Sequence, residues 1–280
     1  MNNKIVAIVG ALVFVVVVAG SGCVGGGSTA TDMIKMVPEG DGAIYFFYAD
    51  VQTIRDDKDL HDIYKEFEKI PSGLEEELVD IDDVNYVAAA GKLGEEESNL
   101  SIFVGRFDLK DVRGKLEYDL DFDKDEYKGV ELWLGEYDKA AAAVAIGKDK
   151  LIIGDEKQVK NCIKVTKGDR TSIYDNESVR DVLNKLPDGI ETTLVTSGDS
   201  HRDGILLAMG SVLMKEDEDI LKMEGVVKFD DEDDAIDARA DFKRNINEAG
   251  VLFDVDVKQK EELLEFSARM GIEDWEEGYS

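Results

Sequence analysis

Apolar residues after position 32 alternate between short continuous runs and helical stripes, which predicts an α+β protein. Ala43–Ala49 is almost continuously apolar, as expected for a strand that is buried on both faces. Leu60, Ile63, Tyr64 and Phe67 follow at helical spacing and predict one core-facing stripe. Further strands are predicted at Val84–Ala90, Leu100–Phe107, Val130–Leu134, Ala140–Ile146 and Leu151–Ile153.

Turn and cap residues divide these elements. Gly147–Lys150 has the composition of a hairpin turn between two of the strands. Apolar stripes within Val159–Ile163 and Val179–Leu186 predict two short helices. The second helix begins after Asp175 or Asn176, either of which can cap it.

A repeated tetrapeptide divides the chain in two. Val37-Pro38-Glu39-Gly40 precedes the first strand, and Leu186-Pro187-Asp188-Gly189 precedes a second β-rich run at Ile190–Ser197. We therefore predict two related βαββ(α) halves with mostly antiparallel sheets covered by helices. The second half is expected to continue with a helix at Gly204–Met214, a hairpin of Lys222–Phe229 and Ala235–Phe242 across Asp230–Asp234, a strand at Val251–Val257 and a helix at Glu261–Met270.

The N-terminus has the pattern of an export signal. Lys4 is followed by Ile5–Ala19, a run of small and apolar residues that is shorter than the ~20 needed to span a membrane. Gly20, Ser21 and Gly22 then precede Cys23. The segment resembles a prokaryotic lipoprotein precursor, and archaeal versions tolerate Gly20 best. The resemblance implies a lipid on Cys23; the alternative is an uncleaved N-terminal anchor.

The expected organisation follows from this signal. The glycine-rich stretch after Cys23 predicts a flexible tether. The body loosely resembles uncharacterised surface lipoproteins in layout, which implies no activity. The predicted units are a signal peptide at 1–22, a lipid-anchored tether at 23–32, and α+β halves at 33–186 and 187–280.

The composition excludes several function classes. The chain has 63 acidic and 33 basic residues, a net charge of −30, so it repels phosphate backbones and is not expected to bind nucleic acid. Its two cysteines and two histidines, His61 and His201, allow neither a disulfide framework nor a histidine-rich metal site. Cys162 lies in an apolar stripe and is predicted to be a core thiol. No metal or cofactor is expected.

The motifs that could indicate catalysis are incomplete. His201-Arg202-Asp203 has the letters of the kinase catalytic loop, but Ala208 stands where that loop needs asparagine. Ser200 lies beside this triplet, and adjacent residues at a helix start do not converge as a hydrolase triad does. We predict a polar helix start at this position, no catalytic residue and no enzyme activity.

Two acidic clusters and two glycosylation sequons complete the candidates. Asp119–Asp125 fails the EF-hand pattern, because neither register puts glycine and glutamate where the loop needs them. Asp230–Asp234 is predicted to be a solvated turn. Asn99 and Asn176 begin sequons that matter because the chain is expected to be exported.

These observations predict a membrane-anchored lipoprotein that faces the outside of the cell and acts as a non-catalytic surface or binding module. Its expected partners are the membrane, through the lipid, and an unidentified protein or envelope component. The first alternative is a carrier of an apolar ligand or lipid, held near the aromatic strand at Tyr45–Tyr48 and the predicted apolar helix at Ile205–Met214. The second is a hydrolase built from scattered carboxylates.

Overall fold

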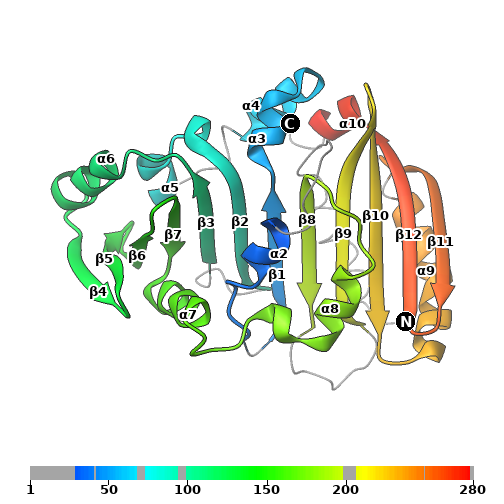
Figure 1. Ribbon diagram of the computed structural model, residues 1–280. Coiled ribbons are helices and arrows are strands. Elements are labelled where there is room, and N and C mark those ends of the chain that lie inside the picture. Colours follow the sequence, from blue (N-terminus) through cyan, green and yellow to red (C-terminus); the bar gives the residue numbers. More distant parts are fainter. Residues whose placement is uncertain are drawn as a thin grey trace.

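The computed structural model describes residues 29–40, 42–67, 73–93, 99–197, 206–248 and 250–277, which contribute 12 strands to one sheet (Figure 1). The strand order is β11-β12-β10-β9-β8-β1-β2-β3-β7-β6-β5-β4, and the neighbouring pairs are antiparallel. This confirms the α+β class with antiparallel pairing. The strands are β1 (Ile44–Ala49), β2 (Val84–Lys92), β3 (Asn99–Gly105), β4 (Asp123–Tyr127), β5 (Val130–Tyr137), β6 (Ala140–Ile146), β7 (Lys150–Gly154), β8 (Glu191–Thr196), β9 (Leu206–Asp217), β10 (Ile220–Phe229), β11 (Phe253–Lys260) and β12 (Leu263–Gly271).

Helices cover both faces of the sheet. One face, here called the α7 face, packs against α2 (Thr29–Ile34), α7 (Glu156–Thr166) and α8 (Glu177–Leu183). The opposite face, here called the α9 face, carries the remaining helices that contribute to its core. These are α3 (Val51–Asp56), α4 (His61–Phe67), α5 (Leu74–Leu78), α6 (Leu109–Gly114), α9 (Glu232–Glu248) and α10 (Ile272–Glu277). Among the described residues, no helix is long and apolar enough to cross a bilayer.

The core of the α7 face is built on β1. Phe46 is 0% exposed and lies opposite Ala90 of β2 and Leu194 of β8, so its ring fills the space over two strands. Tyr48 stacks on Tyr86 with ring centroids 6.2 Å apart. The aromatic strand predicted from the sequence is therefore present, and these side chains pack against one another.

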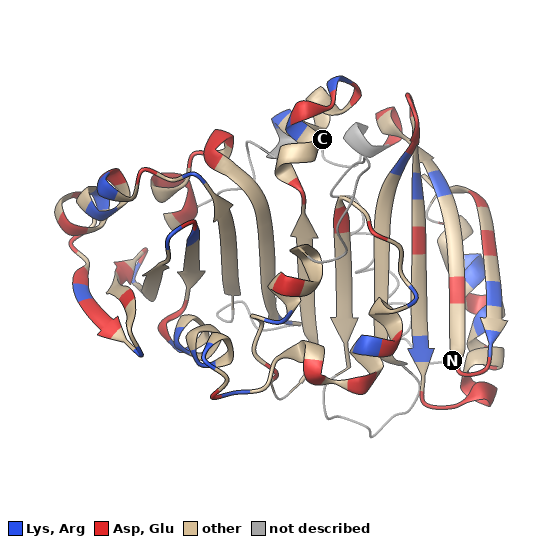
Figure 2. Ribbon diagram, in the orientation of Figure 1, with Lys and Arg blue, Asp and Glu red and all other residues tan. Residues whose placement is uncertain are grey.

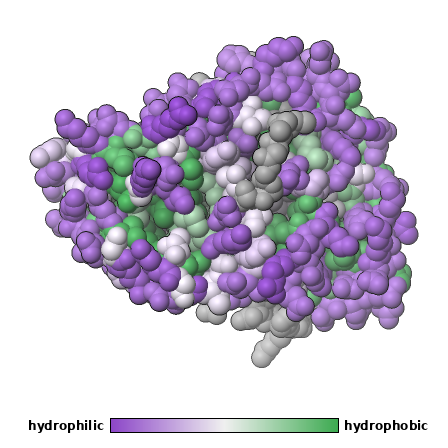
Figure 3. All heavy atoms as spheres, in the orientation of Figure 1, coloured by the Kyte–Doolittle hydropathy of each residue, from purple (hydrophilic) through white to green (hydrophobic). Residues whose placement is uncertain are grey.

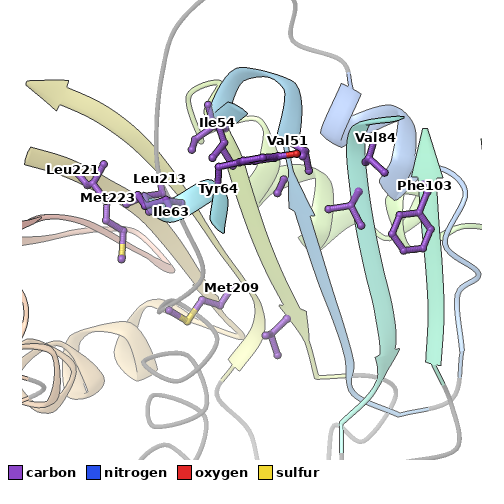
Figure 4. Packing of buried hydrophobic residues seen from close by; sticks show 14 of the residues in the cluster. Val51, Ile54, Ile63, Tyr64, Val84, Phe103, Met209, Leu213, Leu221 and Met223 are labelled. Carbon is purple, nitrogen blue, oxygen red and sulfur yellow. The ribbon is translucent and has the colours of Figure 1, made fainter. Parts of the chain in front are cut away.

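The core of the α9 face lies between the sheet and the short helices that follow β1. Ile54 of α3 and Ile63 of α4 belong to the same apolar cluster as Leu213 of β9 and Met223 of β10, and Ile63 lies beside Leu213 (Figure 4). Further along this face, Phe266 of β12 lies over Gly225, where a Cβ atom would meet the ring at 2.1 Å. The absence of a side chain at residue 225 thus allows the aromatic ring to pack directly against the backbone of β10.

Local sequence signals correctly predicted most helices and strands of the first half. The turn at Gly147–Lys150 closes with a 2.8 Å hydrogen bond from the Gly147 amide to the Lys150 carbonyl. Asn176, one of the two candidate caps, accepts from the Val179 amide and begins α8. Strands β1–β3 and β5–β7 lie where they were predicted, within two or three residues at their ends.

Three predictions in the second half are wrong. The segment predicted as a helix at Gly204–Met214 contributes residues 206–214 to strand β9, and Glu261–Met270 lies mostly in strand β12. Ala235–Phe242, predicted as a strand, lies within helix α9.

The physical reasons lie in tertiary pairing. Strand β9 lies between β8 and β10 and is apolar on both faces. The spacing of its apolar residues therefore does not distinguish a buried strand from a buried helix. In α9 the buried residues are Ala235, Ala238, Phe242 and Ile246, a helical spacing. The Asp231 side chain accepts from the Asp234 amide, so the acidic run starts this helix and is not a hairpin turn.

Candidate functional site

A cleft of about 180 Å³ opens beside the first turns of α7. Its walls come from the ends of β1, β2 and β3, from the Pro-acid-Gly segment at residues 37–40, and from Arg170 after α7. These segments are far apart in the sequence and meet only in the folded chain. A cavity of about 150 Å³ can hold benzene, so the cleft has room for one small group and is smaller than the usual ligand pocket of about 300–1,000 Å³.

One wall of the cleft is held by a short β-bridge. Pro38 pairs with Ser172, and the Glu39 amide donates to the Thr171 carbonyl at 3.1 Å. The Arg170 guanidinium donates to the Glu39 carbonyl, and the Thr171 hydroxyl donates to the Glu39 carboxylate at 2.8 Å. These contacts fix Arg170 and Glu39 relative to each other.

The other wall is the N-terminal part of α7. The Asp155 side chain accepts from the Gln158 amide at 3.0 Å, which caps the helix. Asn161 lines the cleft and is only 6% exposed; its amide oxygen accepts from Lys164 at 3.3 Å. Lys157 is exposed at the rim. A buried amide at the base and a cation at the rim give this wall its polar character.

The charge of the cleft differs from that of the whole protein. Lys92, Lys157 and Arg170 line it together with one carboxylate, Glu39, among the described lining residues. Residues 148–170 carry seven basic and four acidic side chains in a chain of net charge −30. Figure 2 shows basic residues along α7. The region therefore gathers positive charge on a strongly acidic protein.

The sequence reasoning missed this site. The lysine-rich run from Lys148 to Arg170 is visible in the sequence and could have indicated it, because it reverses the local sign of charge. The contribution of Lys92 and of residues 37–40 has no local signal. The tetrapeptide at 37–40 was expected only to precede the first strand. In the folded chain it forms a wall of the cleft.

Cys162 lies one residue beyond the polar base of the cleft and faces the core. It is 0% exposed, and burial raises the pKa of its thiol to about 12. A thiol that stays protonated is a poor nucleophile and metal ligand. The prediction of a core thiol is consistent with this burial.

The remaining sequence candidates do not converge on the cleft. Asn176 caps α8, and Asn99 accepts from the Tyr45 hydroxyl at 3.0 Å at the start of β3. Both asparagines are exposed, and the use of their sequons stays a prediction. Cys23 and the segment Ser200–Asp203 lie outside the described residues.

A carboxylate with a strongly lowered pKa lies elsewhere, on the α9 face. Arg113 of α6 donates two hydrogen bonds to Glu131 of β5, at 2.8 and 2.9 Å, and these lower the pKa of Glu131 to about 2. Trp133 donates a third at 3.0 Å. This bidentate pair joins a helix to the sheet, so its perturbed pKa has a structural explanation.

A second perturbed carboxyl lies in the middle of the sheet. Glu191 of β8 is 4% exposed, and its Oε1 atom has no hydrogen-bond partner among the described residues. It lies opposite Ala49 and Leu213, two members of the apolar cluster on the α9 face. Burial raises the pKa of Glu191 well above its ordinary value of 4.5.

The acidic cluster at Asp119–Asp125 marks an edge of the sheet. Asp123 and Asp125 lie on β4, the outermost strand at one end, and β4 is exposed from Asp123 to Glu126. Asp121 has a left-handed backbone with φ of 55°. Charged residues on an edge strand prevent pairing with another chain, which gives this cluster a structural role.

We expect calcium to bind both acidic clusters only weakly and without saturation. Successive residues of β4 point to opposite faces, and Asp231 is used as a helix cap. In the described part of the chain, no group of three histidine, cysteine or acidic residues is placed to hold a metal ion. Calorimetric titration at low and high salt measures this, with Asp123→Asn as the variant and magnesium as the control ion. A saturable, micromolar, calcium-specific site would contradict the prediction.

Comparisons with known proteins bear on the fold. No protein-family model and no curated protein sequence matches the chain. Among solved structures, the chain is similar to the one titled "Structure of crystal form I of TP0453", with a TM-score of 0.51 and 12% sequence identity. The match covers 88% of this chain and 95% of that one. At this identity, the likeness shows a shared fold alone.

Proposed function

We propose that the protein is a lipid-anchored module on the outer side of a cell membrane that binds a ligand or partner without catalysing a reaction. The cleft beside α7 is the observation that carries the binding role. It combines apolar walls, a buried amide and three cationic side chains in one concave site. The anchor and the location rest on residues 4–23 of the sequence.

The chemistry of the cleft supports binding over catalysis. Its described lining contains lysine, arginine, amide and carboxylate side chains, and no serine, threonine, cysteine or histidine. Hydrolysis by carboxylates, which the hypothesis requires, uses a pair of them, and the described lining contributes one, Glu39. The hydrolase hypothesis therefore has no support from this cleft.

The carrier hypothesis keeps only part of its original support, because Tyr45 and Phe47 are half-buried whereas the other features have structural roles. The aromatic side chains Phe46 and Tyr48 pack in the core of the α7 face, and the segment predicted as an apolar helix belongs to strand β9 as far as it is described. Figure 3 shows hydrophilic residues along the outline of the α7 face, with hydrophobic residues at the surface over the region of β3, β7 and β6 and again on the right, over the strands near α8.

We also propose that the two sides of the sheet are related units. From the centre outward, one side has the order β1-β2-β3-β7-β6 and the other β8-β9-β10-β12-β11. The two first strands, β1 and β8, pair with each other in antiparallel orientation. In each unit a helix, α6 or α9, connects the third strand to later ones and lies on the α9 face. Strands β4 and β5 extend the first unit. This arrangement supports the predicted boundary near Pro187.

The anchor is tested by changing Cys23 to serine. The exported variant is expected to leave the detergent phase in a two-phase partition, because the tether then carries no lipid. Cys162→Ser is the matched control, and it should remain in the detergent phase because that thiol is buried in the body. A Cys23→Ser protein that stays membrane-bound with residues 5–19 intact would replace the lipid with an uncleaved anchor.

A further inference from the structure

The chain enters the folded body in the middle of the α7 face. Helix α2 begins at Thr29, the first residue of the part that the structure describes, and it packs on β1 and β2. Met33 and Ile34 of α2 are 2% and 0% exposed and belong to the same apolar cluster as Phe46. Strand β1 lies sixth in the order of the 12 strands, so α2 covers the centre of the sheet (Figure 1). Packing therefore fixes the point at which the chain enters.

A lipid on Cys23 would lie close to this point of entry. Six peptide steps join the Cα atom of Cys23 to that of Thr29, and in any conformation they span at most about 22 Å. Five strand steps lead from β1 to β11 at one edge of the sheet and six lead to β4 at the other. At about 4.8 Å a step these distances are about 24 and 29 Å. The connection is thus too short to pass around either edge to the α9 face.

The charge of the helices agrees with this geometry. Counted over the helices alone, and so without connections such as residues 94–98, the α7 face is neutral, with −1 from α2, +2 from α7 and −1 from α8. The helices of the α9 face carry −10, with −3 from α5, −3 from α9 and −4 from α10, while α4 and α6 cancel and α3 is neutral. A membrane that contains anionic headgroups therefore repels the helices of the α9 face more strongly.

Building on the proposed lipid anchor, we infer that the short connection to Cys23 holds the α7 face against the phospholipid headgroups of the membrane. The outer sides of α2, α7 and α8 face the lipid. The α9 face, with its acidic helices, points away from the membrane. A partner in the surroundings therefore meets the α9 face first.

Single fluorescent labels on the lipidated full chain measure which face lies near the bilayer. Cys162 is 0% exposed and Cys23 carries the lipid, so an added surface cysteine takes the label. The exposed positions are Asn184 after α8 on the α7 face, Ala240 of α9 on the α9 face and Gln52 of α3 at one end of the strands. The vesicles are phosphatidylcholine mixed with phosphatidylglycerol, and a nitroxide on the lipid headgroup quenches the label. We expect quenching to be several-fold stronger at Asn184→Cys than at Ala240→Cys or Gln52→Cys.

A longer connection is the matched control, because it changes no residue of the folded body. Eighteen glycine and serine residues inserted between Gly27 and Ser28 raise the reach to about 80 Å, which exceeds the distance around either edge. Quenching at Asn184→Cys and Ala240→Cys should then become similar.

Three results would overturn the inference. They are quenching at Ala240→Cys or Gln52→Cys as strong as at Asn184→Cys, no quenching at any position, and an unchanged pattern with the long connection. Flotation of the vesicles reads the anchor separately. Protein that does not float with them contradicts the lipid anchor itself, whereas floating protein with one of the three results contradicts the orientation alone.

Discussion

Replacing Glu191 with glutamine is expected to stabilise the protein at neutral pH. The Glu191 carboxyl lies between Ala49 and Leu213 in an apolar layer, and its Oε1 atom lacks a partner among the described residues. Burial raises its pKa in the folded state well above the unfolded value near 4.5. At neutral pH the Glu191 carboxylate must therefore take up a proton when the chain folds. Glutamine has the same shape and carries no charge, so the variant folds without this cost.

The sign of the pH dependence follows from proton linkage. Below the unfolded pKa the carboxyl is protonated in both states, and the contribution of Glu191 to stability is fully present. As the pH rises through and above that value, only the unfolded chain releases the proton, so the native protein loses about 1.4 kcal/mol of unfolding free energy for each pH unit until the folded pKa is reached. Glu191→Gln should lack this loss, so its stability relative to the unchanged protein should increase as the pH rises from 4 towards 7.

Urea unfolding of both proteins between pH 4 and pH 8 measures the difference. The other carboxylates titrate equally in the two proteins, so their contributions cancel in the difference of unfolding free energy. The gain should vanish near pH 4 and grow towards neutrality. Glu191→Met, which removes the polar atoms as well, should be more stable than Glu191→Gln. A difference that does not change with pH would show that the carboxyl is solvated in the folded protein, and a gain that falls as the pH rises would show that it is paired with a cation.

Replacing Phe46 with alanine should have the largest destabilising effect, about 3–5 kcal/mol of unfolding free energy. Phe46 is 0% exposed in the central strand, and its neighbours across the sheet are Ala90 and Leu194. Because the paired strands on both sides hold β1 in place, the backbone cannot move to fill the space left by the ring. Part of the cost is thus the cavity and part is the lost burial of apolar surface.

Phe253→Ala is the matched control for the same chemical change. Phe253 is 42% exposed on the edge strand β11, so removal of its ring should cost less than about 1 kcal/mol. Equilibrium urea unfolding measures the unfolding free energy of both variants. An unchanged slope of this free energy against urea concentration would show that the unfolded state is the same. Equal effects of the two substitutions would show that Phe46 is not the buried centre of the α7 face.

The amino-acid sequence by itself determined the elements whose signals are local. The apolar run at Ala43–Ala49, the turn at Gly147–Lys150 and the cap at Asn176 each depend on a few neighbouring residues, and all three lie where they were expected. The antiparallel character was also predictable, since several strands alternate between apolar and polar residues. Such signals act over a few residues, because caps, turns and periodicity involve only adjacent parts of the backbone.

Only the tertiary structure decided how these elements combine. Residues 206–214 are a strand because β8 and β10 pair with them on both sides, and α9 is a helix because its apolar residues can reach the sheet at helical spacing. The pairing of β1 with β8 makes one sheet of the two predicted halves. The cleft joins Glu39, Lys92, Lys157 and Arg170, and Glu191 is buried by strands on either side of it. Pairing and burial between distant segments depend on the free energy of the whole chain, and for that reason no local pattern contains them.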